Sequence, residues 1–558
     1  MDTDTTPPSP TSAKRLLEES SGIPSLPKRL KLSDHQPSKD ADPISAASGA
    51  TSHLPVEPSE KAAELEKSPK KKRDAAGFPK SRKGKDKDNR NPGRKRRGTR
   101  NEESKGETSL EQVEPKESRL PKRQCALLLG FCGSQYSGMQ IQPNVRTIEN
   151  VVFDVLVKIG AVSKDNADDP VKVNIGRAAR TDAGVHAAGN VVSLKMITTV
   201  PGVPNLVESV NAELPPDIRL WGYVRVQNKF NARLLCDSRK YTYFFPTYIL
   251  LPPKFGCNLD RVLKGYAASL PPSSRPVPSK PDTSFWTIDD ATKEDELRRK
   301  REWRVKPDIL QKLRIIAKKY DGTHNFHNFT VGRVFSDRSN QRHMKKIEVA
   351  DPVVYGNTEW ISVVFHGQSF MLHQRKMMSG MILTARLEVP ESMIDELFGP
   401  PIVFIPKMPS LGLLLEGPIY DSYNSKIAKV NETLQPTDAE YRPPIDFGIH
   451  AAAIEEFKQK HIYDNMRLVE DRNGLFDQWI RAVDSYAGND LLYLNPRGII
   501  PEIAKIKKDQ RRENPFRERK LFNCTSFTTE GQLTEKSLDD GEESDTAIEK
   551  RTLLDTEG

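Results

Sequence analysis

Apolar residues occupy one continuous part of this chain, and that distribution limits where it can fold. Residues 1–122 are rich in Ser, Pro, Lys, Glu and Asp and contain almost no aromatic residues, and from about Lys508 the hydrophobic pattern is lost again. Such segments bury too little apolar surface to offset the entropy cost of ordering the chain. We therefore expect disordered tails at 1–122 and 508–558, with the ordered region between them.

The region between the tails alternates between strand-like and helix-like patterns. QCALLLGFCG, from Gln124, is a short apolar run ending in glycine, which is typical of a buried strand. After Thr147, a candidate N-cap, apolar residues recur at helical spacing as far as Ile159. Further strands are predicted in DIRLWGYVRV, SRKYTYFF and the hairpin-like HMKKIEVADPVVYGNTEWISVVFHG, and further helices in PNLVESVNAELP, PDILQKLRIIAKKYDG, FMLHQRKMMSGMILTAR and AAAIEEFKQKHIY. Because hairpin-like pairs occur without regular βαβ crossovers, we predict an α+β fold: a largely antiparallel sheet with flanking helices.

A glycine-rich stretch, GRAARTDAGVHAAGNVVSLK, places charged side chains among very small ones. Gly176 and Gly184 permit a tight turn and the close approach of another backbone or a ligand. Asp182 is expected on a loop between two apolar strands, with Arg177 and Arg180 beside it, and a guanidinium orients a neighbouring carboxylate. That arrangement suits a nucleophile or a base, but it equally suits a structural turn with a surface ion pair. The residues alone leave both interpretations open.

Sequence signatures of several other chemistries are missing. No second carboxylate motif accompanies Asp182 as a glycosidase needs, and GxGxxG, Walker, HExxH and GxSxG motifs are absent. The five cysteines form no CxxC pair and have no matching histidine spacing, so neither a disulfide framework nor a zinc site is predicted. We therefore predict no cofactor and no metal.

The charge and the termini indicate the cellular setting. A formal net charge of +10 and a pI of about 9.1 favour a polyanionic partner. No apolar run approaches the roughly 18 residues that a membrane span needs, and the N-terminal MDTDTTPPSP has no apolar core of a secretory signal. We expect a soluble intracellular protein with no membrane partner.

Basic runs mark the N-terminal tail. PKRLKL, KSPKKKRD and GRKRRG cluster Lys and Arg, the second beside a Ser-Pro pair. Such runs are typical of signals read by the nuclear import machinery, and we therefore expect the protein in the nucleus. A non-specific RNA-gripping arm, or simply a solvated tail, is the alternative interpretation.

Several blocks, in order along roughly residues 123–505, resemble the TruA-type tRNA pseudouridine synthases. GRAARTDAGVHAAGNVVSL resembles the signature of that family, and GFCGSQYSGMQIQPNVRTIE its opening segment. FNARLLCDSRKYTYFFPT resembles its tyrosine-bearing strand, YDGTHNFHNFT with FHGQSFMLHQRKMM its second-half core, and IPKMPSLGLLLE its last block. The basic tails, the sequence HNFHNFT and the C-terminal extension are most similar to the eukaryotic nuclear tRNA pseudouridine synthase 1 branch.

This resemblance implies isomerisation of uridine to pseudouridine in RNA, by base flipping and by cleavage and rejoining of the glycosidic bond. Asp182 matches the catalytic aspartate, which either attacks the nucleotide or removes a sugar proton. Arg180 matches the arginine that assists base flipping, and Tyr241 matches the tyrosine that stacks on the uracil. By alternation alone, Tyr241 shares a strand face with Tyr243 and Phe245, a pattern more typical of core packing.

The resemblance also implies that Arg375 belongs to the site, although its spacing from the preceding Gln differs from the family pattern. The family pattern has one residue between the Gln of HQ and the next Arg, and that Arg is expected to pair with the catalytic aspartate. Here Arg375 follows Gln374 directly. Loss of one helical residue rotates the later part of a helix by about 100° relative to the earlier part. Either the helix start adjusts, or Lys376 or another group takes the role of this arginine.

Other basic residues of these blocks are substrate-binding candidates. Arg177 and His186 flank Asp182, and Arg239 and Lys240 precede the tyrosine. We expect the arginines and the lysine to line an RNA-binding cleft, whereas His186 would either contact substrate or only hydrogen-bond the turn. His373, on a predicted apolar helix, is expected to be a core histidine.

The domain prediction has five parts. Two catalytic subdomains form the RNA-binding cleft: residues 123–235 with the ARTD motif, and residues 236–430 with a proline-rich and charged insertion at about 251–306. A C-terminal extension at 431–507 and the two tails complete the chain. The charged ATKEDELRRKREW of the insertion is expected to form a solvent-facing helix, and its Arg298–Arg301 cluster to help select substrate.

The predicted partner is tRNA, modified around the anticodon stem-loop, with small nuclear RNA as a second substrate; a monomer and a homodimer stay equally open. The altered spacing before Arg375 favours one alternative, a catalytically impaired RNA-binding protein or tRNA chaperone of the same fold. A nuclear scaffold acting through its tails is a third class, but it would leave the glycine-rich motif unexplained.

Overall fold

The computed structural model describes residues 120–274, 284–288, 290 and 292–507. All of them belong to one compact unit of the chain, Glu111–Gly558. Apart from residues 120–122, the predicted tails and the basic runs lie outside the described residues. The predicted division into two catalytic subdomains stays a prediction.

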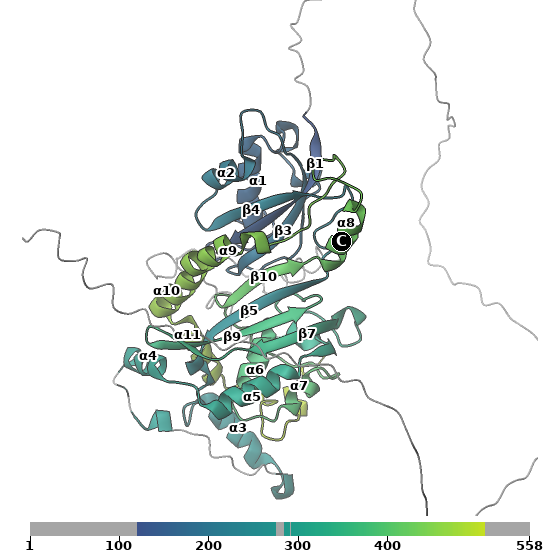
Figure 1. Cartoon of the computed structure of the whole chain (residues 1–558). Coiled ribbons are helices and arrows are strands. Elements are labelled where there is room, and N and C mark those ends of the chain that lie inside the picture. Colours follow the sequence, from purple (N-terminus) through teal and green to yellow (C-terminus); the bar gives the residue numbers. More distant parts are fainter. Residues whose placement is uncertain (1–119, 275–283, 289, 291, 508–558) are drawn as a thin grey trace, which may run out of the picture. The chain divides into compact units, whose positions relative to one another are not determined.

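A single sheet of ten strands organises the described residues (Figure 1). Its order is β4-β1-β3-β10-β5-β9-β7-β6, with β2 paired to β3 and β8 paired to β9. The strands are β1 Lys122–Phe131, β2 Gly176–Arg177, β3 His186–Ile197, β4 Ile218–Arg225, β5 Ser238–Pro246, β6 Gly322–Asn325, β7 Gln341–Val349, β8 Val353–Tyr355, β9 Thr358–Gly367 and β10 Leu413–Ile419.

One strand pair of this sheet is parallel and the others are antiparallel. β3 and β10 run parallel, with His186 opposite Leu414 and Ala187 opposite Leu415. β10 then pairs antiparallel with β5, so strands that are far apart in the sequence meet at the centre of the sheet. The predicted α+β fold with a largely antiparallel sheet is confirmed. The parallel junction was not predicted, because local sequence patterns do not show which distant strands pair.

Helices flank the sheet, and capping residues in the sequence mark the ends of several of them. Thr147 caps α1 by accepting the backbone N–H of Asn150, and Gly160 ends it in the left-handed region. Pro307 occupies the first turn of α5. The α-helices are α1 Ile148–Ile159, α2 Leu206–Glu213, α3 Asn258–Ser269, α4 Lys293–Glu302, α5 Pro307–Lys318, α6 Lys376–Arg386, α7 Ser392–Leu397, α8 Asp421–Asn431, α9 Ala451–Phe457, α10 Asp464–Asn473 and α11 Leu475–Asp484. Within the described ranges, each helix falls short of the length and apolarity that a membrane crossing requires.

Two large apolar clusters hold helices against the sheet. One packs α1 and α2 on β1, β3 and β4, and the other packs α5, α6 and α11 on β5, β7 and β9 (Figure 1). Residues after α8 tie the strands together, because three aromatic pairs reach three different strands: Phe457 with Trp221, Tyr463 with Phe244, and Phe476 with Trp360. The predicted C-terminal extension therefore packs on β4 at one edge of the sheet and on β5 and β9 further along it.

The insertion differs from its prediction. It contains the helix α3, which was not predicted and buries only Leu259, and α4 is only partly solvent-facing. Lys300 of α4 is buried between Glu296 and Asp477, with both Nζ–carboxylate distances at 2.7 Å. Arg299 binds Asp290, and Arg301 donates to backbone carbonyls of α10. Of the Arg298–Arg301 cluster, only Arg298 is largely exposed, so these side chains mainly hold the fold.

The segment at β10 provides a test of this packing. At Gly412 a Cβ would lie 2.1 Å from the backbone oxygen of Phe244, whereas at Gly417 no atom lies within 4 Å of that position. We expect Gly412→Ala to lower the free energy of unfolding by about 2 kcal/mol or more, because the strand must shift to accept the methyl group. Gly417→Ala is the matched control and should change it by less than about 1 kcal/mol. Urea denaturation measures both, and equal stabilities of the two variants would contradict the register of β5 and β10.

Candidate active site

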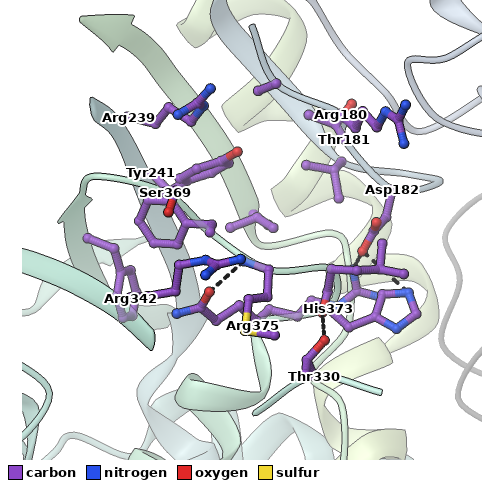
Figure 2. A pocket seen from close by; sticks show the side chains of 18 of the residues that line it. Arg180, Thr181, Asp182, Arg239, Tyr241, Thr330, Arg342, Ser369, His373 and Arg375 are labelled. Carbon is purple, nitrogen blue, oxygen red and sulfur yellow. Dashed lines mark hydrogen bonds and ion pairs between the residues drawn. The ribbon is translucent and has the colours of Figure 1, made fainter. Parts of the chain in front are cut away.

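A cavity of about 420 Å³ lies where the glycine-rich motif meets the segment before α6. This volume falls in the range of about 300–1,000 Å³ that is usual for sites of small ligands. Its walls come from residues 177–185, from β5 with the residues before it, from residues 330–342, and from residues 365–378. Asp182 and His373 lie on one side of the pocket, and Tyr241 and Arg342 on the other (Figure 2).

The loop that carries Asp182 is held by backbone contacts on each side. Gly184 adopts a φ of 76°, which closes the turn after Asp182 at little steric cost. The buried amide of Asn190 bonds both the N–H and the carbonyl of Ala179. Arg239 of β5 donates two hydrogen bonds to the carbonyl of Ala178. Arg239 therefore lines the pocket and also fixes the loop.

Asp182 pairs with Arg375. Arg375 Nη1 lies 2.6 Å from Asp182 Oδ2, and its Nε donates to the carbonyl of Met408 at 2.9 Å. The shortened spacing is absorbed before the helix, because α6 begins only at Lys376 and His373 adopts a positive φ of 58°. Lys376 itself points to the carbonyl of Thr330. The sequence left two alternatives open: an adjusted helix start, or another group such as Lys376 in place of Arg375. In the structure the helix start is adjusted, and Arg375 keeps its pairing with Asp182.

Arginine dominates the charge of the pocket wall. Seven arginines and one carboxylate, Asp182, line the cavity; the arginines are Arg177, Arg180, Arg233, Arg239, Arg333, Arg342 and Arg375. Guanidinium groups bind phosphate oxygens through paired N–H donors, so this wall favours a phosphate-bearing ligand. Asp182 is therefore surrounded by positively charged N–H donors, which would attract the phosphate backbone of a nucleic acid.

Tyr241 lines the pocket and is only partly buried, and its ring packs against both apolar clusters. Tyr243 and Phe245 on the same strand are completely buried, and of these two only Tyr243 also lines the pocket. The Tyr241 ring packs edge-on against Phe370, with centroids 4.8 Å apart. Burial raises the pKa of the Tyr241 hydroxyl to about 12, and the charge of Asp182 adds to that shift. The phenol therefore keeps its proton at neutral pH.

Arg177 and Arg180 both reach the pocket wall, as predicted from the motif. Arg177 is held by Glu149 of α1, with Nε–Oε1 at 2.5 Å, and the Glu149 side chain is only 1% exposed. Burial raises the pKa of Glu149, while Arg177 and Arg180 oppose that shift. Lys240, the other cleft candidate, does not line the cavity. Glu149 was not predicted as part of the site.

Comparison with known proteins decides the family. A sequence model of the family described as "tRNA pseudouridine synthase" matches residues 316–421. A Candida glabrata protein named "tRNA pseudouridine synthase 1" is 40% identical over 413 residues, 67% of this chain and 72% of that protein. The chain belongs to the tRNA pseudouridine synthase family.

Two further relatives support this assignment. A Yarrowia lipolytica protein named "tRNA pseudouridine synthase 1" is 40% identical over 429 residues, 69% of this chain and 79% of that protein. A Saccharomyces cerevisiae protein named "tRNA pseudouridine(27/28) synthase" is 37% identical over 368 residues, 60% of this chain and 96% of that protein. The predicted resemblance is confirmed: the chain is an RNA pseudouridine synthase, an isomerase that acts on tRNA.

His186 of this pseudouridine synthase lies outside the pocket, contrary to its prediction as a substrate-binding residue. The ring is completely buried at the start of β3. The N–H of Gly133 donates to Nδ1 at 3.2 Å, so Nε2 carries the proton and donates to the carbonyl of Leu411 at 3.1 Å. Both ring nitrogens therefore join backbone segments around the β3–β10 junction.

Of His324, His327 and His373, only His373 lines the cavity. His373 precedes α6 and lines the pocket, so the prediction of a core histidine was wrong; the apolar run suggested a helix that starts too early. His324 stacks on Phe398, and His327 is buried and contacts the carbonyl of Pro401, and neither lines the cavity.

Several pocket residues were not predicted. Arg233 stands in a block that resembles the family, but its place on the wall depends on the turn before β5. Thr330 ends the YDGTHNFHNFT block, Arg333 comes from the connection of β6 to β7, and Arg342 comes from β7. Arg333 and Arg342 stand outside the blocks that resemble the family. Among the described residues, no group of three or more His, Cys, Asp or Glu side chains converges as a metal site would. The absence of a metal and of a cofactor stays a prediction.

Burial of His186 predicts a pH-dependent stability. Burial lowers the pKa of this imidazole from 6.5 to about 4, so the unfolded chain takes up the proton first as the pH falls. The contribution of His186 is complete above pH 6.5 and declines towards pH 4, by about 2 kcal/mol between pH 7 and pH 5. Urea denaturation at both pH values should show that His186→Gln lacks this decline. An equal decline in wild type and variant would contradict a buried neutral imidazole.

Proposed function

We propose that the enzyme flips a tRNA uridine into the arginine-lined pocket and isomerises it there with Asp182. In the reaction, the N1–C1′ bond breaks, the uracil turns, and C5 bonds to C1′. The hydrogen on C5 leaves as a proton, and N1 gains one, so the reaction needs no redox partner and no net hydrolysis. The ion pair of Asp182 with Arg375 inside the cavity is the observation that carries this proposal.

Each residue has a role that follows from its position. Asp182 acts at the sugar, either by attack at C1′ or by removal of a sugar proton, and Arg375 orients its carboxylate. Tyr241, a neutral phenol with its ring edge-on to Phe370, offers a face on which the uracil stacks. Arg180, two residues before Asp182 in the glycine-rich motif, fills the space that the uridine leaves in the RNA stack.

The alternative of a catalytically impaired RNA-binding protein rested on the spacing before Arg375. The distance of 2.6 Å between Arg375 Nη1 and Asp182 Oδ2 removes that support, because the pair forms in spite of the shorter segment. Catalysis is therefore the function that we propose for this site.

Replacement of Asp182 tests the chemistry. Tritium leaves 5-[³H]-uridine when C5 bonds to C1′, so release from labelled tRNA reports each turnover. We expect wild type to release tritium and Asp182→Ala to lose the signal by about 10⁴-fold or more, with tRNA affinity within about threefold, because the carboxylate acts in the reaction and contributes little to binding. Release by the variant at a wild-type rate would contradict the role of Asp182.

We further propose that the target uridines lie around the anticodon stem-loop, with small nuclear RNA as a second substrate. Support comes from the name of one relative, which specifies positions 27/28 of tRNA, and these positions belong to the anticodon stem in standard tRNA numbering. The basic pocket wall fits either folded RNA.

Mapping of the products tests this substrate choice. Total tRNA and small nuclear RNA treated with the enzyme would be labelled at pseudouridine with a carbodiimide and read by reverse transcription. We expect new stops in the anticodon stem-loop that Asp182→Ala does not produce, because the variant lacks the reacting carboxylate. Stops confined to other arms of tRNA would contradict the proposed target, and a lack of stops in small nuclear RNA would exclude the second substrate.

We also propose that the protein works in the nucleus, imported through the basic runs PKRLKL, KSPKKKRD and GRKRRG. Clustered Lys and Arg in a segment of low hydrophobicity suit recognition by import receptors. A fluorescent fusion of the full chain should accumulate in nuclei, and replacement of the Lys and Arg of all three runs by Gln should leave it in the cytoplasm. A nuclear signal that survives this replacement would contradict import through these runs.

A further inference from the structure

The backbone of His373 is held in an unusual conformation at the pocket wall. Its φ of 58° lies in the left-handed region, which residues other than glycine seldom adopt. Strained residues of this kind cluster at functional sites, where the surrounding structure holds them in place. Here the strain turns the ring towards Asp182, which Figure 2 shows on the same side of the pocket.

The His373 ring lies between a carboxylate and an ammonium group. Nε2 is 3.7 Å from Asp182 Oδ2, and Nδ1 is 3.4 Å from Lys407 Nζ. An ammonium group donates and cannot accept, so Nδ1 must be the acceptor. The ring proton is then on Nε2, the nitrogen that faces Asp182.

The partner that sets this tautomer is itself held in place. Lys407 is buried, and its carbonyl accepts a hydrogen bond from Trp479 Nε1 of α11 at 3.0 Å. Trp479 is completely buried in the core. The C-terminal helices therefore fix the backbone from which Lys407 reaches His373.

We propose that His373 is a positioning residue for Asp182, and this inference rests on the proposed function. With uridine bound, Nε2–H donates to Asp182 Oδ2 beside Arg375. The 3.7 Å separation is longer than a hydrogen bond, as catalytic contacts often are before substrate binds. Because His373 and Arg375 reach the same oxygen, Asp182 Oδ1 is directed to the sugar. No proton is transferred in this step.

Removal of the ring without new backbone strain tests the proposal. Glycine tolerates a positive φ, so His373→Gly removes the imidazole and keeps the backbone conformation. In the tritium-release assay on tRNA, we expect kcat to fall by about 10- to 100-fold, with the dissociation constant for tRNA within about threefold, because a mispositioned carboxylate affects chemistry more than binding. Glu388→Gly, at a positive φ of 53° outside the pocket, is the matched control and should keep the wild-type kcat.

Chemical rescue separates a hydrogen-bonding role from a structural one. Added imidazole should restore much of the kcat of His373→Gly, because it supplies one N–H donor and one acceptor in the vacated space. 1-Methylimidazole should not, because its neutral form has no N–H to donate to Asp182. Lys407→Met should lower kcat in the wild-type background and cause no further loss in the His373→Gly background.

The outcomes distinguish this inference from the proposed function. Two results together support both the proposed function and the role of His373. The wild type releases tritium and Asp182→Ala does not, and imidazole restores the kcat of His373→Gly. A wild type that releases no tritium contradicts both. An unchanged kcat in a folded His373→Gly variant, or equal rescue by the two imidazoles, overturns the role of His373 and leaves the function of Asp182 standing.

Discussion

The ion pair between Asp182 and Arg375 joins parts of the chain that are 193 residues apart, and the architecture of the sheet brings them together. The strand after Asp182 pairs in parallel with β10 at the centre of the sheet. β10 in turn comes soon after Met408, whose carbonyl accepts a hydrogen bond from Arg375. A parallel junction in an otherwise antiparallel sheet therefore places both halves of the pair in one pocket.

Charge balance in the pocket depends on this pair. Seven guanidinium groups around one carboxylate would repel one another in a buried site, and acidic side chains of the fold pair with three of them: Glu149 with Arg177, Asp337 with Arg333, and Asp182 with Arg375. Phosphate groups of RNA can neutralise others when substrate binds. Tyr241 stays a neutral phenol beside these charges, because burial outweighs the neighbouring guanidinium of Arg239.

Elements with strong local signals could be predicted from sequence. The ends of α1 follow from Thr147 and Gly160, and the motif predicted Asp182 as a pocket residue. The rest depends on contacts that local patterns do not contain. The pairing of β3 with β10 determines that His186 is buried, and the late start of α6 determines that His373 faces Asp182. Arg333, in the connection of β6 to β7, and Arg342, in β7, reach the pocket through the packing of distant segments.

The most direct measurement is the single-turnover rate of Arg375→Ala on saturating tRNA, compared with Lys376→Met. If Arg375 orients the catalytic carboxylate, its loss should slow the chemical step by about 100-fold or more while tRNA still binds, and the lysine variant should keep most of the wild-type rate. A wild-type rate in Arg375→Ala, with the loss appearing in Lys376→Met instead, would contradict the account and assign the pairing role to the lysine.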